Sequence, residues 1–248
     1  MALIFPASAA VERARLLVEG TDQIVLSMHT WLIRTPQKTI LVDTCNGNHK
    51  KRNPPNIGML QTDWLEHLLA AGITPDDVDA VVCTHLHADH VGWNTHRLNG
   101  SWLPTFPNAR YLMPDADYRH FAPDGPGSTD ATRIVFSDSI LPVADQTELI
   151  AGDYQLSDSL WLRPAAGHTP GSTVVWLDAG VPAVFVGDLT HCPIQIPRPG
   201  DACAFDVDAD EAAVTRKRIF TEAARRRSEE RRVGKECEVP CRSRWSPY

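Results

Sequence analysis

The stretch Thr84-His85-Leu86-His87-Ala88-Asp89-His90-Val91-Gly92-Trp93 places three histidines and an aspartate within six residues, directly after the apolar run Ala80-Val81-Val82-Cys83. Imidazole nitrogens and carboxylate oxygens are the ligands that borderline divalent metals such as zinc take. The first two histidines alternate in an extended segment and can point to one side, while the aspartate and the third histidine come from the following loop or helix start. The stretch predicts a metal centre with room for two ions. A solvated histidine patch is the competing interpretation, and it accounts poorly for four such side chains so close together.

Two later segments follow the same pattern: a predicted strand leads into a loop that carries side chains able to bind metal. The first is Pro164-Ala165-Ala166-Gly167-His168-Thr169-Pro170-Gly171-Ser172, which lies between two strand-like runs. The second is Ala183-Val184-Phe185-Val186-Gly187-Asp188. Taken alone, His168 is typical of a turn and Asp188 of a turn or a helix cap. The first motif favours the interpretation of both as metal ligands.

In the order T-H-L-H-A-D-H, G-H-T-P-G-S and V-G-D, these motifs resemble the metallo-β-lactamase superfamily of hydrolases, from roughly Ile24 to Arg227. The resemblance implies an α/β fold of the four-layer αββα sandwich type. It also implies two divalent metal ions, zinc by preference, with a hydroxide between them. The implied ligands are His85, His87 and His168 on one metal, Asp89 and His90 on the other, and Asp188 bridging both.

The family implies a dinuclear metal-dependent hydrolase, esterase-like or lactonase-like, acting on an ester, a lactone or a phosphotriester. Metal-bound water becomes a nucleophile near neutral pH. The resemblance implies that Asp89 and Asp188 are the catalytic carboxylates, with Asp89 able to orient the hydroxide or pass a proton to the leaving group. The stretches Gly187–His191, Phe205–Asp208 and Ala212–Lys217 resemble the methyl parathion hydrolase and lactonase-like branch. A metal-binding or di-iron redox protein of the same fold, without hydrolytic turnover, is the alternative, and the identity of the metal separates the two.

Three further residues are candidates for supporting the ligands or lining the substrate pocket. Asp43 ends the apolar run Thr39–Val42, where the family places an aspartate that supports the ligands, although a turn residue is the other interpretation. Trp93 either walls the pocket or belongs to the core. His191, three residues after the predicted bridging ligand, either lines the pocket or caps a turn.

The end of the chain differs in character. From about Arg227 the sequence resembles an in-frame translation of a sequencing adapter, so we expect a hydrolase domain over residues 1–227 and a non-native tail over residues 228–248. A genuine tail of mixed charge is the alternative. The family supplies one more histidine to the second metal from near the C-terminus, and no histidine follows His191 in this chain. The expectation is a C-terminally truncated fold with a weak second metal site, unless His191 supplies a ligand.

Composition restricts the remaining possibilities. The 248 residues are 43% hydrophobic and 22% charged, which suits one domain with a sizeable core. A net charge of −7 without basic stripes argues against nucleic acid and favours a small-molecule substrate. Scattered cysteines at 45, 83, 192 and 203 indicate reduced thiols. We expect a cytoplasmic protein without a membrane span or secretion signal, and the sequence does not define an oligomeric state.

Hydrophobic periodicity and turn residues predict the elements that would carry these motifs. The expected elements are hairpin strands at 23–28, 30–34 and 38–42, a helix at 62–71, a short strand at 110–113, a helical insert at 114–141 and a helix at 208–226.

Overall fold

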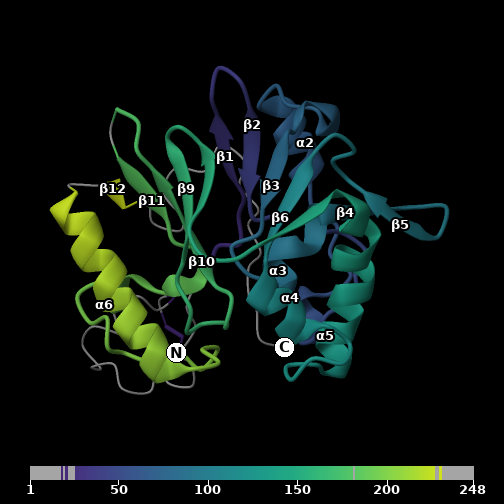
Figure 1. Ribbon diagram of the computed structural model, residues 1–248. Helices are drawn as coiled ribbons and strands as arrows, with labels where there is room; N and C mark the ends of the chain where they lie inside the picture. The colour runs from purple at the N-terminus through teal and green to yellow at the C-terminus, as the bar shows by residue number, and fades with distance from the viewer. Residues whose placement is uncertain (1–17, 19, 22–25, 181, 227–228, 231–248) are drawn as a thin grey trace. The chain divides into compact units, whose positions relative to one another are not determined.

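The computed structural model describes residues 18, 20–21, 26–180, 182–226 and 229–230. The chain divides into two compact units, which we call the N-unit and the C-unit. The described part of the N-unit is residues 27–150, and that of the C-unit is chiefly residues 151–230. Each unit contains one five-stranded sheet (Figure 1).

The N-unit sheet has the strand order β1-β2-β3-β6-β7. Its strands are β1 (Trp31–Arg34), β2 (Thr39–Val42), β3 (Ala80–Val82), β6 (Arg110–Pro114) and β7 (Thr147–Ile150). The first pair is antiparallel and the others are parallel. β3 is a short, continuous apolar run and all of its residues are buried, as expected for a parallel strand covered on both faces.

Helices and one hairpin complete the N-unit. The α-helices are α2 (Trp64–Ala70), α3 (Ala88–Val91), α4 (Asp115–Phe121) and α5 (Asp130–Val135), and the hairpin pairs β4 (Thr95–Leu98) with β5 (Ser101–Pro104). Short 3₁₀ turns occupy Pro55–Ile57, Pro75–Asp77, Gly92–Asn94 and Leu141–Gln146, and a π-helical turn spans Phe136–Ile140.

The C-unit sheet has the order β12-β11-β10-β9-β8. Its strands are β8 (Tyr154–Ser157), β9 (Leu160–Pro164), β10 (Thr173–Leu177), β11 (Ala183–Phe185) and β12 (Glu229–Glu230). Only β11 and β12 run parallel. The helix α6 (Ala209–Arg225) lies beside this sheet (Figure 1). It buries Ile219 and Ala223 in one cluster with residues of β10 and β11. Two 3₁₀ turns, Gly187–Leu189 and Pro193–Gln195, follow β11.

Most of the elements expected from the sequence are confirmed. The hairpin of β1 and β2, the helix α2, the strand β6, the helical insert with α4 and α5, and the helix α6 all form at the predicted places. The predicted strand at 23–28 is not confirmed: residues 26–28 form no strand, and residues 23–25 lie outside the described residues. Of the predicted tail, only residues 229–230 are described, so its foreign origin stays a prediction.

Two further expectations concern the cysteines and the membrane. Cys45, Cys83, Cys192 and Cys203 are buried, and none of them forms a disulfide bond among the described residues, while their reduced state stays a prediction. Among the described residues, no helix combines the length and the apolar character that a membrane crossing requires.

A close backbone approach holds the end of the predicted metal-binding motif in place. The Gly92 amide donates to the Cys45 carbonyl at 2.6 Å. A Cβ on Gly92 would lie 1.9 Å from the Asn46 carbonyl carbon, so only glycine fits. This contact fixes the end of α3, the helix that carries Asp89 and His90.

Replacing Gly92→Ala should therefore lower the free energy of unfolding by about 3 kcal/mol or more, since the added methyl meets backbone that cannot move aside. Denaturant unfolding followed by circular dichroism measures the change. The matched control is Gly200→Ala, whose Cβ would come no closer than 3.9 Å to a flexible lysine side chain, and which should change stability by less than about 0.5 kcal/mol. Equal stability of the two variants would contradict the prediction.

Candidate metal centre

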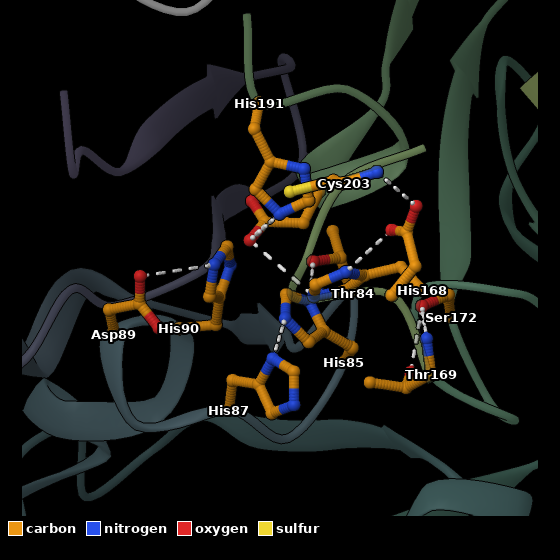
Figure 2. A network of polar contacts seen from close by, with 12 residues as sticks. Thr84, His85, His87, Asp89, His90, His168, Thr169, Ser172, His191 and Cys203 are labelled. Atoms are coloured by element: carbon orange, nitrogen blue, oxygen red, sulfur yellow. Dashed lines mark hydrogen bonds and ion pairs between the residues drawn. The ribbon is translucent and has the colours of Figure 1, made fainter. Parts of the chain in front are cut away.

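The N-unit gathers four of the predicted ligands in the turn after β3 and in the helix α3. The His85 Nε2 and the His87 Nδ1 lie 3.1 Å apart, and the rings of His85 and His90 have centroids 3.9 Å apart (Figure 2). The Asp89 carboxylate lies 3.7 Å from the His90 Nε2. His85 and His90 are buried, whereas Asp89 keeps part of its side chain exposed. The sequence motif thus forms one compact cluster in space.

The Asp43 carboxylate holds this cluster in place through hydrogen bonds. One oxygen accepts the backbone N–H of Thr84 at 2.8 Å, and the other accepts the Thr84 hydroxyl and the His90 Nδ1–H, each at 2.8 Å. Because Nδ1 of His90 is held in this way, its Nε2 faces Asp89 and remains available to a metal. Asp43 adopts a left-handed conformation with φ of 58° at the end of β2. The structure therefore places Asp43 in contact with a predicted ligand, as the family resemblance implies.

Other contacts fix the same turn. The buried Asp117 at the start of α4 accepts the Leu86 N–H at 3.0 Å. Trp93 is 5% exposed and stacks on Trp64 with ring centroids 5.3 Å apart. Trp93 thus lies in the core of the N-unit, which is the alternative that the sequence left open.

The C-unit brings together the later predicted ligands. Nε2 of His168 lies 3.6 Å from an Asp188 carboxylate oxygen, and Nε2 of His191 lies 3.2 Å from the same oxygen. His168 comes from the turn between β9 and β10, and Asp188 from the 3₁₀ turn after β11. Gly167 permits this arrangement, because its φ is +132° and a Cβ there would lie 2.3 Å from the backbone of Ala212 at the start of α6.

Asp206 supports His168 as Asp43 supports His90. Its carboxylate lies 3.3 Å from the His168 Nδ1, 3.3 Å from the Arg216 guanidinium and 3.1 Å from the Cys203 backbone N–H, which donates to it. Burial alone would raise the pKa of Asp206, but His168, the Cys203 amide and Arg216 outweigh it and lower the pKa. Neither Asp206 nor Arg216 was assigned a role from the sequence. Their only signal was the resemblance of the stretches Phe205–Asp208 and Ala212–Lys217, which gives no partner for the carboxylate.

The His191 ring lies beside Cys203 (Figure 2), and its Nε2 faces the Asp188 carboxylate. Burial lowers the pKa of His191, but the Asp188 carboxylate and the contact with Cys203 outweigh burial and raise it to about 10. The imidazole of His191 therefore faces a predicted metal ligand, and its place in a substrate pocket stays a prediction.

The donor atoms of each unit fit a zinc-type ion. Ligand atoms held roughly 2.0–2.2 Å from a tetrahedral zinc lie roughly 3.3–3.6 Å from one another. The separations of 3.1 and 3.7 Å in the N-unit and of 3.2 and 3.6 Å in the C-unit are within a few tenths of that range. In the C-unit, His168, His191 and Asp206 also offer donor atoms that all lie within 4.8 Å of one another. Imidazole and carboxylate donors at these distances suit zinc better than a purely oxygen-bound ion.

The fold and these clusters agree with the comparison to known families. The family described as "Metallo-beta-lactamase superfamily" matches residues 25–226, and the chain belongs to it. A probable metal-dependent hydrolase from Staphylococcus aureus superimposes with a TM-score of 0.80 at 18% identity, covering 92% of this chain and 82% of the other. The metallo-β-lactamase fold expected from the sequence is thereby confirmed.

Among individual relatives, lactonases recur. The N-acyl homoserine lactonase AiiB of Agrobacterium fabrum is 34% identical over 80 residues, which are 28% of this chain and 29% of AiiB. The chain thus matches less than a third of the length of that relative. An N-acyl homoserine lactonase of a Bacillus species is 22% identical over 208 residues, covering 77% of this chain and 76% of the relative. The dizinc quorum-quenching lactonase AidC superimposes with a TM-score of 0.76 at 20% identity, covering 92% of this chain and 80% of AidC.

Replacing Asp43→Asn should weaken metal binding by about 10- to 100-fold, because His90 loses the carboxylate that fixes its ring and its tautomer. Titration of the metal-free protein with zinc against a chromophoric chelator measures the affinity. Asp145→Asn, at an exposed position, is the control and should bind as the unchanged chain does. Unchanged affinity in Asp43→Asn would show that the carboxylate does not support a ligand.

Replacing Asp206→Asn should destabilise the chain by about 3–5 kcal/mol, since it leaves the fully buried Arg216 guanidinium without its carboxylate. The control is Asp178→Asn, which removes the carboxylate of a surface pair with Arg226 and should cost at most about 1 kcal/mol. Chemical denaturation of both variants, free of metal, compares the two losses. A similar small loss in both would contradict the prediction.

Proposed function

We propose that this protein is a metal-dependent hydrolase with two zinc ions, acting on an ester, a lactone or a phosphotriester. One repeated feature carries the proposal: in each unit a buried carboxylate holds Nδ1 of a histidine and leaves Nε2 to face other donor atoms. Asp43 does this for His90, and Asp206 for His168. Metal-binding histidines are commonly oriented in this way, whereas a histidine that only fills space needs no such partner.

We assign the ligands by their correspondence to the family motifs. The separations within each unit, described above, support the assignment. One ion would be held by His85, His87 and His168, the other by Asp89 and His90, and both by Asp188.

The chain's own groups define how a reaction could proceed. Bound zinc ions would lower the pKa of a water molecule to near 7 and polarise the bond to be cleaved. The Asp89 carboxylate is the group suited to move a proton, because its side chain is 29% exposed while those of the supporting residues Asp43 and Asp206 are 7% and 0% exposed. It would accept the proton of the attacking water and deliver it to the leaving oxygen. Asp43 and Asp206 keep the imidazoles in one orientation throughout.

A lactone is the first substrate to test. The relatives reported above are named for N-acyl homoserine lactones, and ring opening of a lactone is ester hydrolysis. The family resemblance also covers aryl esters and phosphotriesters, which belong in the same panel.

The experiment removes metal with a chelator, restores zinc, and measures turnover of N-acyl homoserine lactones, aryl esters and a phosphotriester. We expect activity that disappears with the metal, returns with zinc, and falls by about 100-fold or more in Asp89→Asn. Metal content is measured in the same variant, because Asp89 is also assigned as a ligand. A fully zinc-loaded chain that cleaves no member of the panel would disprove the hydrolase proposal. Preferential binding of iron with visible absorption and reactivity toward oxygen would favour a redox protein instead.

A further inference from the structure

The helix α6 has one face packed on the sheet of the C-unit and another that is exposed (Figure 1). The packed face buries Ile219 and Ala223. Six exposed residues lie along the other side, and we call them the α6 stripe: Asp210, Glu211, Val214, Lys217, Arg218 and Thr221. Their spacings of three and four residues place them above one another on a helix. The α6 stripe is therefore one continuous surface.

The α6 stripe is symmetric in position about Val214 and opposite in charge on its two sides. Two acids, Asp210 and Glu211, lie four and three residues before Val214. Two bases, Lys217 and Arg218, lie three and four residues after it. A two-fold axis at Val214 would therefore place each acid of one helix opposite a base of an antiparallel copy.

The acids and bases of the α6 stripe do not neutralise one another within the helix. Side chains three or four residues apart can meet on a helix, but the closest acid and base, Glu211 and Lys217, are six residues apart, roughly 9 Å along the axis. Within the described residues, Asp210, Glu211 and Lys217 form no ion pair. Arg218 uses one guanidinium nitrogen to donate to the Pro164 carbonyl at 2.8 Å. All four charges can therefore pair with another molecule.

The apolar side chains and the shape of this face have the same symmetry. Val214 is 65% exposed, more than any other large apolar side chain among the described residues. Val207, 54% exposed, lies seven residues before Val214, and Thr221 lies seven residues after it. Thr221 belongs to a hollow of about 540 Å³ whose described lining is Lys217, Arg218, Thr221, Glu222 and Arg225. The same two-fold axis would bring Val207 of one copy to the hollow of the other.

The hollow is positively charged. Its one acid, Glu222, is already paired with Arg163 at 2.9 Å and with Arg226 at 2.7 Å. The bases Lys217, Arg218 and Arg225 therefore determine the charge that a partner meets. The exposed start of α6, with Asp210 and Glu211, supplies acids that match it.

Stabilisation of the helix itself does not explain the whole pattern. Acids in the first turn of a helix interact favourably with its dipole, which accounts for Asp210 and Glu211. Lys217 and Arg218 lie in the middle of this 17-residue helix, where the dipole has little effect. Val214 gains nothing from its exposure to water. The bases and the valine therefore indicate a partner.

We propose that the α6 stripe is a docking surface for a second copy of this chain, with two antiparallel α6 helices related by a two-fold axis at Val214. Asp210 then pairs with Arg218 of the second copy, and Glu211 with its Lys217, each pair formed twice. A purely acidic macromolecule would meet the acids of the stripe as well as its bases, whereas a second copy matches both. Because the stripe is confined to one helix, we expect weak association, with a Kd of roughly 10–100 µM.

The first test is sedimentation velocity of the full chain over a range of concentrations. We expect a monomer–dimer equilibrium whose Kd rises about 10-fold or more between about 0.05 and 0.5 M sodium chloride, since salt screens exposed ion pairs. A chain that stays monomeric up to about 200 µM at the lower salt concentration overturns the proposal, and an acidic macromolecule then becomes the alternative occupant.

Reversing the charges tests the pairing itself. A basic variant carries Asp210→Lys and Glu211→Lys, and an acidic variant carries Lys217→Glu and Arg218→Glu. Alone, each should raise the Kd by about 100-fold or more, because four attractive pairs become repulsive. Mixed in equal amounts, the two should form a heterodimer, since every acid again faces a base. Recovery in the mixture also shows that both variants are folded, and failure to recover overturns the pairing.

The position of the axis is tested at Val214, where each copy meets the same residue of the other. Val214→Asp should abolish the dimer, because it places two carboxylates against each other. The matched control is Leu98→Asp, at an apolar position of β4 that is 51% exposed, and it should leave the Kd unchanged. A dimer that survives Val214→Asp, or that is lost in Leu98→Asp alone, places the interface elsewhere and overturns the proposal.

Discussion

The buried Asp43 carboxylate is the contact on which the N-unit site depends. It joins three parts of the chain, because it lies at the end of β2, binds Thr84 after β3, and holds His90 on α3. A buried carboxylate is unfavourable unless hydrogen bonds satisfy its oxygens. These three donors satisfy it only when strand ends and helix have their observed positions. The left-handed backbone at Asp43, which costs about 1–3 kcal/mol, is maintained by the same contacts.

In the C-unit a buried carboxylate also orients a histidine, but its negative charge is balanced in a different way. Asp206 faces Arg216, so this carboxylate has a full positive charge beside it. Asp43 instead has an amide, a hydroxyl and an imidazole as its partners. A cation bound at His90 would therefore complement the charge of Asp43, while the charge of Asp206 is already balanced within the protein. We infer that stability of the N-unit responds more strongly to metal than stability of the C-unit.

Local sequence patterns predicted the parts of the structure that local geometry controls. The spacing of the histidines in residues 84–93 identified a cluster, and periodicity located α2 and α6. The supporting partners could not be found in this way. Asp206 is 38 residues from His168, and Arg216 stands next to Lys217 and Arg218 in a helix whose basic residues look alike in sequence. Only the packing of α6 shows that Arg216 is the buried one.

The irregular loop after β11 explains why position 216 requires arginine. A ligand-bearing loop without regular secondary structure leaves backbone carbonyls that need donors when they are buried. Arg216 supplies donors to the carbonyls of Leu189, Pro199 and Asp201 while it also faces Asp206. A lysine could balance the charge, but a single ammonium has too few donors and too little reach to serve carbonyls on several sides. The same planar group thus fixes the path of the loop and the orientation of His168. The geometry of the C-unit cluster is therefore set from α6, a helix that contributes no predicted ligand.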